Sequence, residues 1–316
     1  MGSSSVRAGL YDTAGHPVGG DPAARIEYEW RTRPEGAMEI DAAALVERTV
    51  RVIDATMGDA RALRAEVVAV ATATLWHSIL GLDARGEPLT PLYGWGDTRA
   101  WRAAHALRQR VDARDTHERT GCFIDPTYPA ARLLWLEEAA GDTFSRVAGW
   151  LSIGEYLELR LLGVRRCSVS MGSGTGLMEL AGCRWDAEML DAVGIAAGSL
   201  SPLVDTDDLS PRLRPEWARR WPELANVPWI PALGDGACAN VGCDAVGEGR
   251  SALTVGTSAA VRVVVEAETI AVPETLWCYR LDRGRRVMGR ALSNAGNGVA
   301  TLGALLRIPD GEETEA

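Results

Sequence analysis

Several features that direct a protein to other compartments or ligands are missing from this sequence. No apolar run approaches the roughly 18 residues that span a bilayer, and the start lacks a basic segment followed by an apolar one. The cysteines show neither C-x-x-C nor paired Cys/His spacing, which disfavours a zinc site and a disulfide framework. We therefore expect a cytoplasmic protein with reduced thiols, no metal-ligating residues and no membrane partner.

Positive charge is also in short supply. The chain of 316 residues has 33 Lys and Arg against 43 Asp and Glu, a formal net charge of −10. A nucleic acid or an anionic membrane needs a basic face, so neither is an expected partner. A hydrophobic content of 47% is ample for the core of one large domain or two smaller ones. If the ligand is a nucleotide, local dipoles and a divalent cation must offset the negative background.

The common nucleotide-binding motifs are absent as well. The Ser/Gly-rich run SVSMGSGTG at 168–176 is predicted to be a loop that suits a phosphate. It matches neither the G-x-x-x-x-G-K-S/T of a P-loop nor the G-x-G-x-x-G of a dinucleotide site. Neither of those nucleotide-binding folds is therefore supported.

Residues 230–265 carry the first sign of chemistry. Asp235 stands between two glycines at the start of a helix predicted over 236–245, and two β-rich runs that follow are joined by Gly256, Thr257 and Ser258. A carboxylate at a glycine-flanked turn can approach a hydroxyl and accept its proton, while backbone N–H groups of a Gly-Thr-Ser turn can wrap a phosphate. The alternatives are an Asp that only caps its helix and an ordinary hairpin turn.

A similar turn occurs at the start of the chain. Gly2, Ser3, Ser4 and Ser5 precede an alternation of Val6, Ala8 and Leu10 that predicts a half-buried strand. Here a turn of small hydroxylated residues is followed by a strand and then by Arg, and residues 256–262 have the same order. This similarity suggests a duplicated unit with a cleft between the two copies. A strand leaving such a turn needs a partner that enters it, so we expect either that a preceding strand is absent or that the turn is frayed.

Two segments are candidates for a substrate wall. Residues 66–75 predict a buried strand, and Trp76 and His77 follow its carboxyl end, where ligands of α/β sheets collect. Trp95, Asp97 and Arg99 lie two apart, so an extended backbone would project an aromatic plate, a carboxylate and a guanidinium to one side to grip a polyol. The alternatives are a satisfied, partly buried His and a Trp in a turn beside a surface ion pair.

The remaining pattern is α/β. Residues 39–57 predict a helix with Asp41 as N-cap, and further helices are predicted over 100–111, 130–138 and 152–162. Strands are predicted over 251–265, 275–279 and 286–290.

Five ordered motifs resemble the FGGY family of carbohydrate kinases. They are YGWGDTRA at 93–100, YPAARLLWLEE at 128–138, SMGSGTG at 170–176, GDGA at 234–237 and GTS at 256–258. The wording WHSILGLD at 76–83 is most similar to the gluconate kinase branch. Arg132 stands where the family signature usually has Lys, which keeps the charge and alters its geometry.

The resemblance implies an α/β, actin/hexokinase-like (ribonuclease H-like) ATPase fold. Residues 1–246 would form the sugar-binding N-terminal domain without its first strand, and residues 247–316 the beginning of a truncated ATP-binding domain. The family's Asp before the first phosphate loop and its later adenosine loop fall outside the sequence. We therefore expect a fragment of a longer kinase.

The resemblance also implies roles for individual residues. Asp235 would be the catalytic base, with ATP and Mg²⁺ in the cleft between the domains. The predicted cofactor-binding residues are Gly2, Ser3, Ser4, Ser5, Gly256, Thr257 and Ser258, and the predicted substrate-binding residues are Trp76, His77, Trp95, Asp97, Arg99 and Tyr128.

The predicted activity is ATP-dependent phosphorylation of a sugar or sugar acid such as gluconate, whose carboxylate Arg99 could bind. The alternatives are a truncated, non-catalytic sugar-binding or regulatory homologue and a kinase for another substrate such as a pentulose. A homodimer is an open alternative to a monomer. An actin-like polymerising protein is disfavoured by the sugar-facing segment at 95–99.

Overall fold

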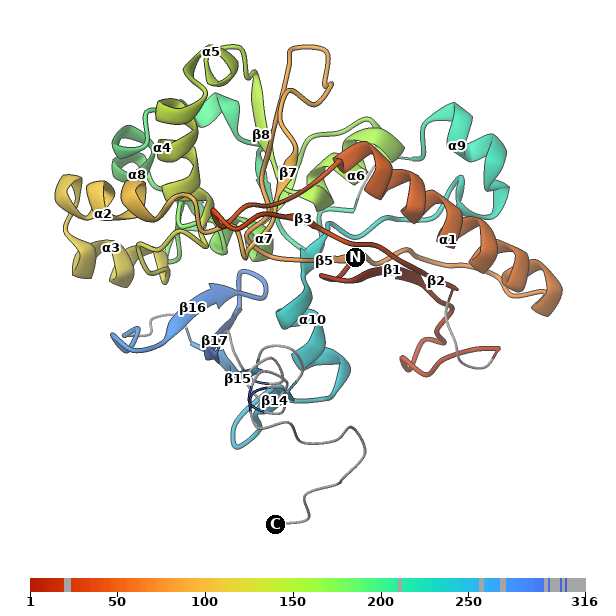
Figure 1. The fold of residues 1–316 in the computed structure, drawn as a ribbon. Coiled ribbons are helices and arrows are strands. Elements are labelled where there is room, and N and C mark those ends of the chain that lie inside the picture. Colours follow the sequence, from red (N-terminus) through yellow and green to blue (C-terminus); the bar gives the residue numbers. More distant parts are fainter. Residues whose placement is uncertain are drawn as a thin grey trace.

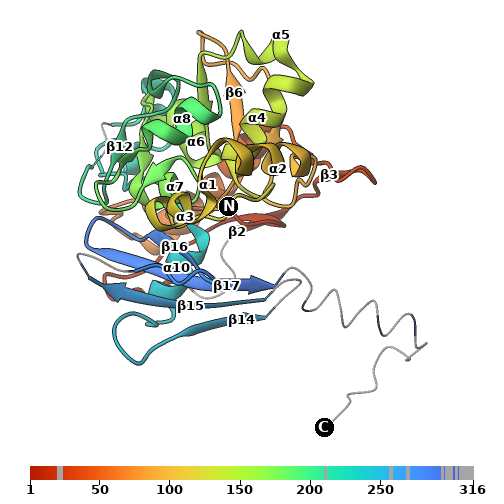
Figure 2. The same ribbon diagram turned by 90° about the vertical axis from the view of Figure 1, so that its left-hand side faces the viewer.

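The structure is a computed structural model, and it describes residues 1–19, 24–209, 212–255, 259–267, 271–292, 295, 302 and 305. Residues 1–234, the N-terminal body, carry most of the helices, and a four-stranded sheet lies against one side of this body (Figures 1 and 2). Helix α10 (Asp235–Gly242) runs from the body to that sheet and contacts both. Among the described helices, none is both long and apolar enough to cross a bilayer.

The helices begin and end where local signals place them. Asp41 accepts hydrogen bonds from the N–H groups of Ala43 and Ala44 and caps the first helix, as predicted. Ser152 forms a capping box with Glu155, and Gly163 ends the same helix at a φ of 76°. The helices of the body are α1 (Ala42–Leu63), α2 (Trp101–Arg110), α3 (Ala113–Thr120), α4 (Pro129–Ala139), α5 (Gly141–Phe144), α6 (Ile153–Leu162), α7 (Val169–Ser173), α8 (Ala187–Ala192) and α9 (Pro215–Arg220), with 3₁₀ turns η1 (Ala197–Ser199) and η2 (Pro222–Leu224).

The strands of the body are short and pair in small groups. The antiparallel groups are β1 (Ser5–Ala8) with β2 (Ala24–Glu27), β3 (Arg31–Thr32) with β4 (Met38–Ile40) and β7 (Leu92–Tyr93), β6 (Leu80–Leu82) with β8 (Gly149–Leu151), and β10 (Met178–Glu179) with β11 (Arg184–Trp185). The parallel pairs are β5 (Ala73–Thr74) with β13 (Leu233–Gly234) and β9 (Cys167–Ser168) with β12 (Leu203–Val204). The β5–β13 pair places the start of α10 beside Trp76.

The second sheet is antiparallel throughout, in the order β14 (Ala252–Val255), β15 (Ala259–Glu266), β17 (Arg285–Leu292), β16 (Trp277–Arg280). The strands predicted in this region are confirmed. Gly256, Thr257 and Ser258, the predicted second phosphate turn, lie outside the described residues.

Two structural predictions are wrong. Residues 66–75 do not form one buried strand, since only Ala73–Thr74 pairs in a sheet and Val68 is exposed. The run 168–176 is not a loop, because residues 169–173 form the buried helix α7. Its hydroxyls bond within the fold: Ser168 Oγ donates to the Ala232 carbonyl at 2.6 Å, and Ser170 Oγ accepts from the Gly234 N–H.

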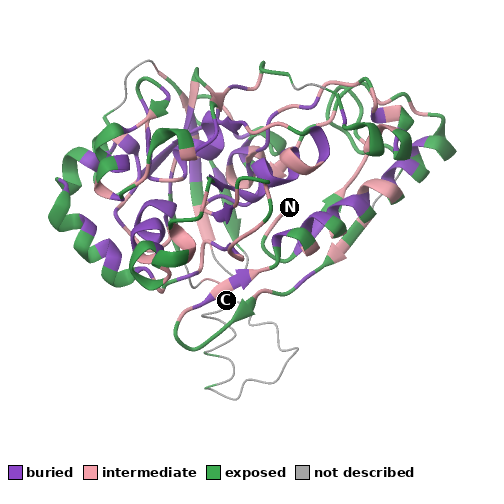
Figure 3. Ribbon diagram, turned by 90° about the horizontal axis from the view of Figure 1, so that it is seen from above, coloured by how far each residue is buried: buried purple, intermediate pink, exposed green. Residues whose placement is uncertain are grey.

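Apolar side chains form separate cores on the two sides of the body. Helix α1 turns a buried face inward and an exposed face to solvent (Figure 3). It packs with α6 over one core, while α2 and α4 enclose a second. A third apolar cluster, which includes Trp76, Tyr128 and Tyr279, joins the body to the second sheet. This third cluster lies next to Asp235.

Candidate functional site

Asp235 is the first residue of α10, directly after β13. Gly234 occupies the N-cap position and offers no side-chain cap, so the alternative in which Asp235 caps the helix is wrong. The carboxylate accepts a hydrogen bond from the N–H of Gly236 at 2.9 Å, and the nearby main-chain N–H of Trp76 lowers its pKa. It therefore sits at the positive end of a helix, held by main-chain groups.

The two glycines beside Asp235 are required by Trp76. A Cβ at Gly234 would lie 1.9 Å from Trp76 Cε2, and one at Gly236 would lie 2.5 Å from Trp76 Cζ3. The indole is held in place because its Nε1 donates to the Ser170 carbonyl at 3.0 Å. Trp76 is thus a buried residue, 6% exposed, whose indole lies beneath the turn that carries Asp235.

Burial dominates the electrostatics of this carboxylate. It raises the pKa of Asp235, against the opposing effects of the Gly236 N–H, the Met1 ammonium, the Trp76 N–H and Arg262. Arg262 comes from β15 of the second sheet, and its guanidinium is tied to Asn240 Oδ1 at 3.0 Å. A carboxylate with a raised pKa is a stronger base, which suits proton abstraction.

The structure brings the turn at residues 2–5 to this carboxylate. Met1 pairs through its main chain with Ala73 and Leu75, next to β13, and its charge interacts with Asp235. The Gly2 N–H donates to the Ser5 carbonyl at 3.1 Å, which closes the turn. The Tyr28 hydroxyl donates to the Gly2 carbonyl.

Within the turn, Ser3 and Ser4 are exposed, whereas Ser5 is buried. Two indole N–H groups bind Ser3: Trp30 donates to its carbonyl at 2.7 Å and Trp95 to its hydroxyl at 3.1 Å. Trp95 therefore links the turn to the segment at 93–100.

The extended arrangement predicted for Trp95, Asp97 and Arg99 is wrong. The Asp97 N–H donates to the Gly94 carbonyl at 3.1 Å and closes a turn. Asp97 is fully buried, and its carboxylate accepts from the Met38 N–H and from Arg99 at 2.6 Å. Arg99 also pairs with Glu39 at 3.1 Å. Of the three residues, Trp95 alone takes no part in this ion-pair cluster, and its side chain is half-buried.

His77 and Tyr128 meet at the body's edge. His77 adopts a φ of 61°, and its Nδ1 lies 2.6 Å from the Gly174 carbonyl. Because a carbonyl only accepts, we assign the proton to Nδ1, which leaves Nε2 as an acceptor. Burial lowers the pKa of His77 to about 4, so the ring is neutral at pH 7. The Tyr128 ring lies 4.9 Å from it between centroids.

Two aromatic residues of the site were missed in the sequence. Trp277 and Tyr279 of β16 stack with ring centroids 4.5 Å apart, and the Tyr279 hydroxyl lies 2.7 Å from that of Tyr128. Tyr279 also meets Trp76 edge-on at 5.0 Å. Their alternation in a predicted strand, in a chain with 6% aromatic residues, was the available signal. Tyr128 is consequently buried beneath the second sheet.

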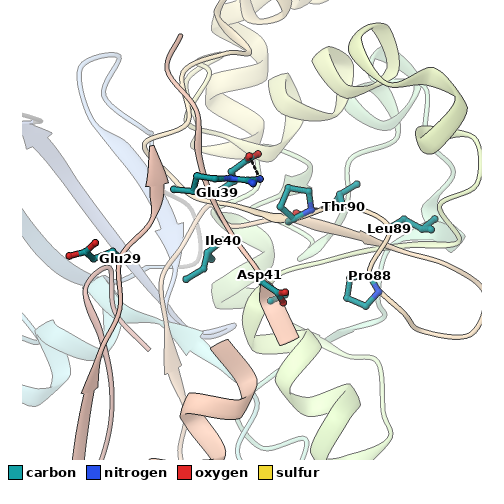
Figure 4. A pocket seen from close by; sticks show the side chains of 10 residues that line it. Glu29, Glu39, Ile40, Asp41, Pro88, Leu89 and Thr90 are labelled. Atoms are coloured by element: carbon teal, nitrogen blue, oxygen red, sulfur yellow. Dashed lines mark hydrogen bonds and ion pairs between the residues drawn. The ribbon is translucent and has the colours of Figure 1, made fainter. Parts of the chain in front are cut away.

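A cavity of about 490 Å³ lies elsewhere on the body, between β4, the start of α1 and residues 88–91 (Figure 4). Two of the carboxylates that line it are engaged: Glu39 pairs with Arg31 and Arg99, and Asp41 caps α1. None of the predicted site residues lines it. Within the described part of the chain, no group of three or more His, Cys, Asp or Glu side chains is arranged to hold a metal ion.

Comparison with known proteins identifies the family of this chain. The profile of the FGGY family of carbohydrate kinases, N-terminal domain, matches residues 1–242. Gluconokinase of Bacillus subtilis (strain 168) is 30% identical over 220 residues, 70% of this chain and 43% of that protein. Xylulose kinase of Escherichia coli (strain K12) is 28% identical over 315 residues, 98% of this chain and 63% of that protein. The chain thus spans less than two thirds of these relatives.

Solved structures show the same fold. The crystal structure of gluconate kinase from Lactobacillus acidophilus superimposes with a TM-score of 0.88 at 25% identity, covering 99% of this chain and 62% of that one. The predicted α/β, actin/hexokinase-like fold class is confirmed. The chain belongs to the FGGY family of carbohydrate kinases.

Proposed function

We propose that the protein to which this chain belongs phosphorylates a hydroxyl of a sugar or sugar acid, with ATP and Mg²⁺ as cofactors and Asp235 as general base. The observation that carries the proposal is the Asp235 carboxylate, half-buried at the start of α10 beside the turn at residues 2–5. Bound Mg–ATP would supply the phosphoryl group. Asp235 would take the proton of the attacking hydroxyl.

The two turns have separate roles in this proposal. Ser3 and Ser4 present exposed hydroxyls at the tight turn near Asp235, where they can hold anionic oxygens. Gly256, Thr257 and Ser258 stay a prediction for the second phosphate turn. We also propose that residues 1–246 form the sugar-binding domain and that residues 247–316 begin the ATP-binding domain.

On the sugar side, we define the proposed substrate wall as Trp76, His77, Trp95 and Tyr128. His77 accepts a sugar hydroxyl through Nε2, and Trp95 offers a half-buried ring to the C–H face of a sugar. Trp76 and Tyr128 support this wall from below, since both are buried. Arg99 is paired with two carboxylates, so a sugar acid would need its cation from elsewhere.

The test is Asp235→Asn in the full-length kinase, assayed for phosphorylation of gluconate and xylulose and, by calorimetry, for binding of each sugar and of ATP. We expect turnover to fall about 10²–10⁴-fold, because general-base help has that size, while sugar affinity changes little. Asp244→Asn is a matched control at the other end of α10, where Asp244 pairs with Arg250 on the surface.

The Asn variant should also be at least as thermostable as the unaltered chain near pH 7. Burial raises the pKa of Asp235, so its charge is disfavoured in the folded state and the amide removes that cost. Near wild-type turnover in the variant would exclude Asp235 as the base. Sugar binding without nucleotide binding would instead support the non-catalytic sugar-binding alternative.

A further inference from the structure

Arg132 is a charged side chain in the interior of the body. It lies on α4 and has no exposed surface. Within the described residues its guanidinium donates to main-chain carbonyl oxygens. The acceptors are His77 at 2.8 Å, Gly94 at 3.0 Å, Thr127 at 3.0 Å and Pro126 at 3.3 Å. One side chain thus bonds three segments that are distant in sequence.

Each of these segments carries a residue of the proposed substrate wall. The first acceptor belongs to His77 itself, Gly94 precedes Trp95, and Thr127 precedes Tyr128. Trp76, the fourth wall residue, is adjacent to His77. A main-chain bridge between Ile79 and Tyr93 joins the first two segments, and Arg132 is the side chain that bonds all three.

The chemistry of the guanidinium suits this position better than an ammonium would. Arg presents donors in a rigid planar fork, whereas Lys offers a single point of charge. Burial lowers the pKa of Arg132 to about 10, so the group keeps its charge near neutral pH. The Asp97 carboxylate favours that charge and Arg99 opposes it. Among the described residues, Arg132 Nε has no hydrogen-bond partner, so the two Nη atoms make the clamp.

The bond to His77 has a further consequence. His77 adopts a left-handed φ of 61°, a conformation that is uncommon for a residue other than glycine. Arg132 binds the carbonyl of that residue, while Gly174 binds its ring. The backbone and the ring are held from opposite ends, which fixes the direction in which Nε2 can accept.

We propose that Arg132 is the positioning residue of the substrate wall: it sets the relative placement of His77, Trp95 and Tyr128 and thereby the affinity for the sugar. This inference rests on the proposed function for its link to sugar binding. The clamp on the three segments stands on the hydrogen bonds alone.

The experiment compares Arg132→Lys with Arg166→Lys in the whole chain. Arg166 is the control because it is also buried, donates to the carbonyls of Asp208 and Trp229 and pairs with the Glu158 carboxylate, yet it bonds no wall segment. We expect R132K to weaken binding of gluconate or xylulose about 10-fold or more by calorimetry, while ATP affinity is unchanged. R166K should lower the thermal midpoint and leave sugar affinity intact. Equal sugar affinities of R132K and the unaltered chain, or an equal loss in R166K, would overturn the positioning role.

Amide hydrogen exchange separates this proposal from the proposed function. The N–H groups of Ile79, Asp97 and Tyr128 are hydrogen-bonded and report on the three segments. R132K should accelerate exchange at all three together, even if the chain binds neither sugar and the proposed function fails. Faster exchange at only one of them would refute the shared clamp.

If R132K does not fold, exchange in the unaltered chain decides the proposal. Added gluconate or xylulose should then slow exchange in all three segments as one unit. The proposal would be overturned if the bound sugar slowed amide exchange in only one segment, or if the sugar bound without slowing exchange in any of them.

Discussion

Acid should destabilise this protein through His77, and the effect can be removed by one substitution. Burial lowers the pKa of His77 to about 4, with Arg132 also opposing the charge and Asp125 favouring it. In the unfolded chain the ring takes up its proton near its ordinary value of 6.5. Between these two values the unfolded state binds more protons than the folded one, so stability falls as the pH falls.

The size of the effect follows from the two pKa values. They differ by about 2.5 pH units, and each unit corresponds to about 1.4 kcal/mol, so His77 accounts for a loss of about 3 kcal/mol between neutral pH and pH 4. About 2 kcal/mol of this is lost by pH 5. Above about pH 7.5 the contribution is constant, because the ring is then neutral in both states.

The variant His77→Asn removes the titration and keeps the local geometry. The Asn amide can donate to the Gly174 carbonyl in place of Nδ1–H, and Asn tolerates the left-handed φ better than most residues. We expect the variant to lose about 3 kcal/mol less than the unaltered chain on acidification to about pH 4.

Urea unfolding, followed by tryptophan fluorescence at several pH values, measures this difference. Carboxylates also titrate in this range, but they do so in both proteins and cancel in the comparison. His16→Asn is the control, since His16 lies on the surface. If the unaltered chain and His77→Asn lost the same stability on acidification, a half-buried His77 that stays neutral in the folded state would be refuted.

The start of α1 and both ends of α6 were predictable from sequence because their signals are local, whereas α1 ends at Leu63 and not at residue 57. Asp41 caps α1, and Ser152 and Gly163 bracket α6, each through contacts within a few residues. The four antiparallel strands of the second sheet follow one another along the chain and were predicted for the same reason.

Segments whose structure depends on distant partners were not predictable. Residues 66–75 are rich in Val and Ala, but only Ala73–Thr74 forms a strand, paired with the distant β13, and Val70 adds an isolated bridge to Trp229. The spacing of Trp95, Asp97 and Arg99 implied a common face only for an extended chain. The backbone instead forms a turn in which the Asp97 N–H bonds to the Gly94 carbonyl, so it is not extended. Asp97 is therefore buried and pairs with Arg99.

In the candidate site, too, features with local signals were predictable and features that depend on distant contacts were not. Asp235 could be selected from sequence because its flanking glycines are adjacent to it. Trp76 is the reason for those glycines, and Arg132, Trp277 and Tyr279 support the wall through contacts across the fold. The alternation of Trp277 and Tyr279 marks them as strand residues, but their contacts with the wall, and those of Trp76 with the two glycines, join distant segments and required the structure.

Two packing predictions remain, both measured by urea unfolding. Gly234→Ala should cost about 1–3 kcal/mol, because the new Cβ would meet the fixed Trp76 ring, whereas Gly198→Ala, with open space around it, should cost little. Equal costs would contradict the close approach. Tyr279→Phe should cost about 1–3 kcal/mol, because it leaves the buried Tyr128 hydroxyl without its 2.7 Å partner. Tyr128→Phe should cost a similar amount, and the double variant should recover much of the loss, since no orphaned hydroxyl is left. Additive losses in this double-mutant cycle would show that the hydroxyl pair does not couple the body to the second sheet.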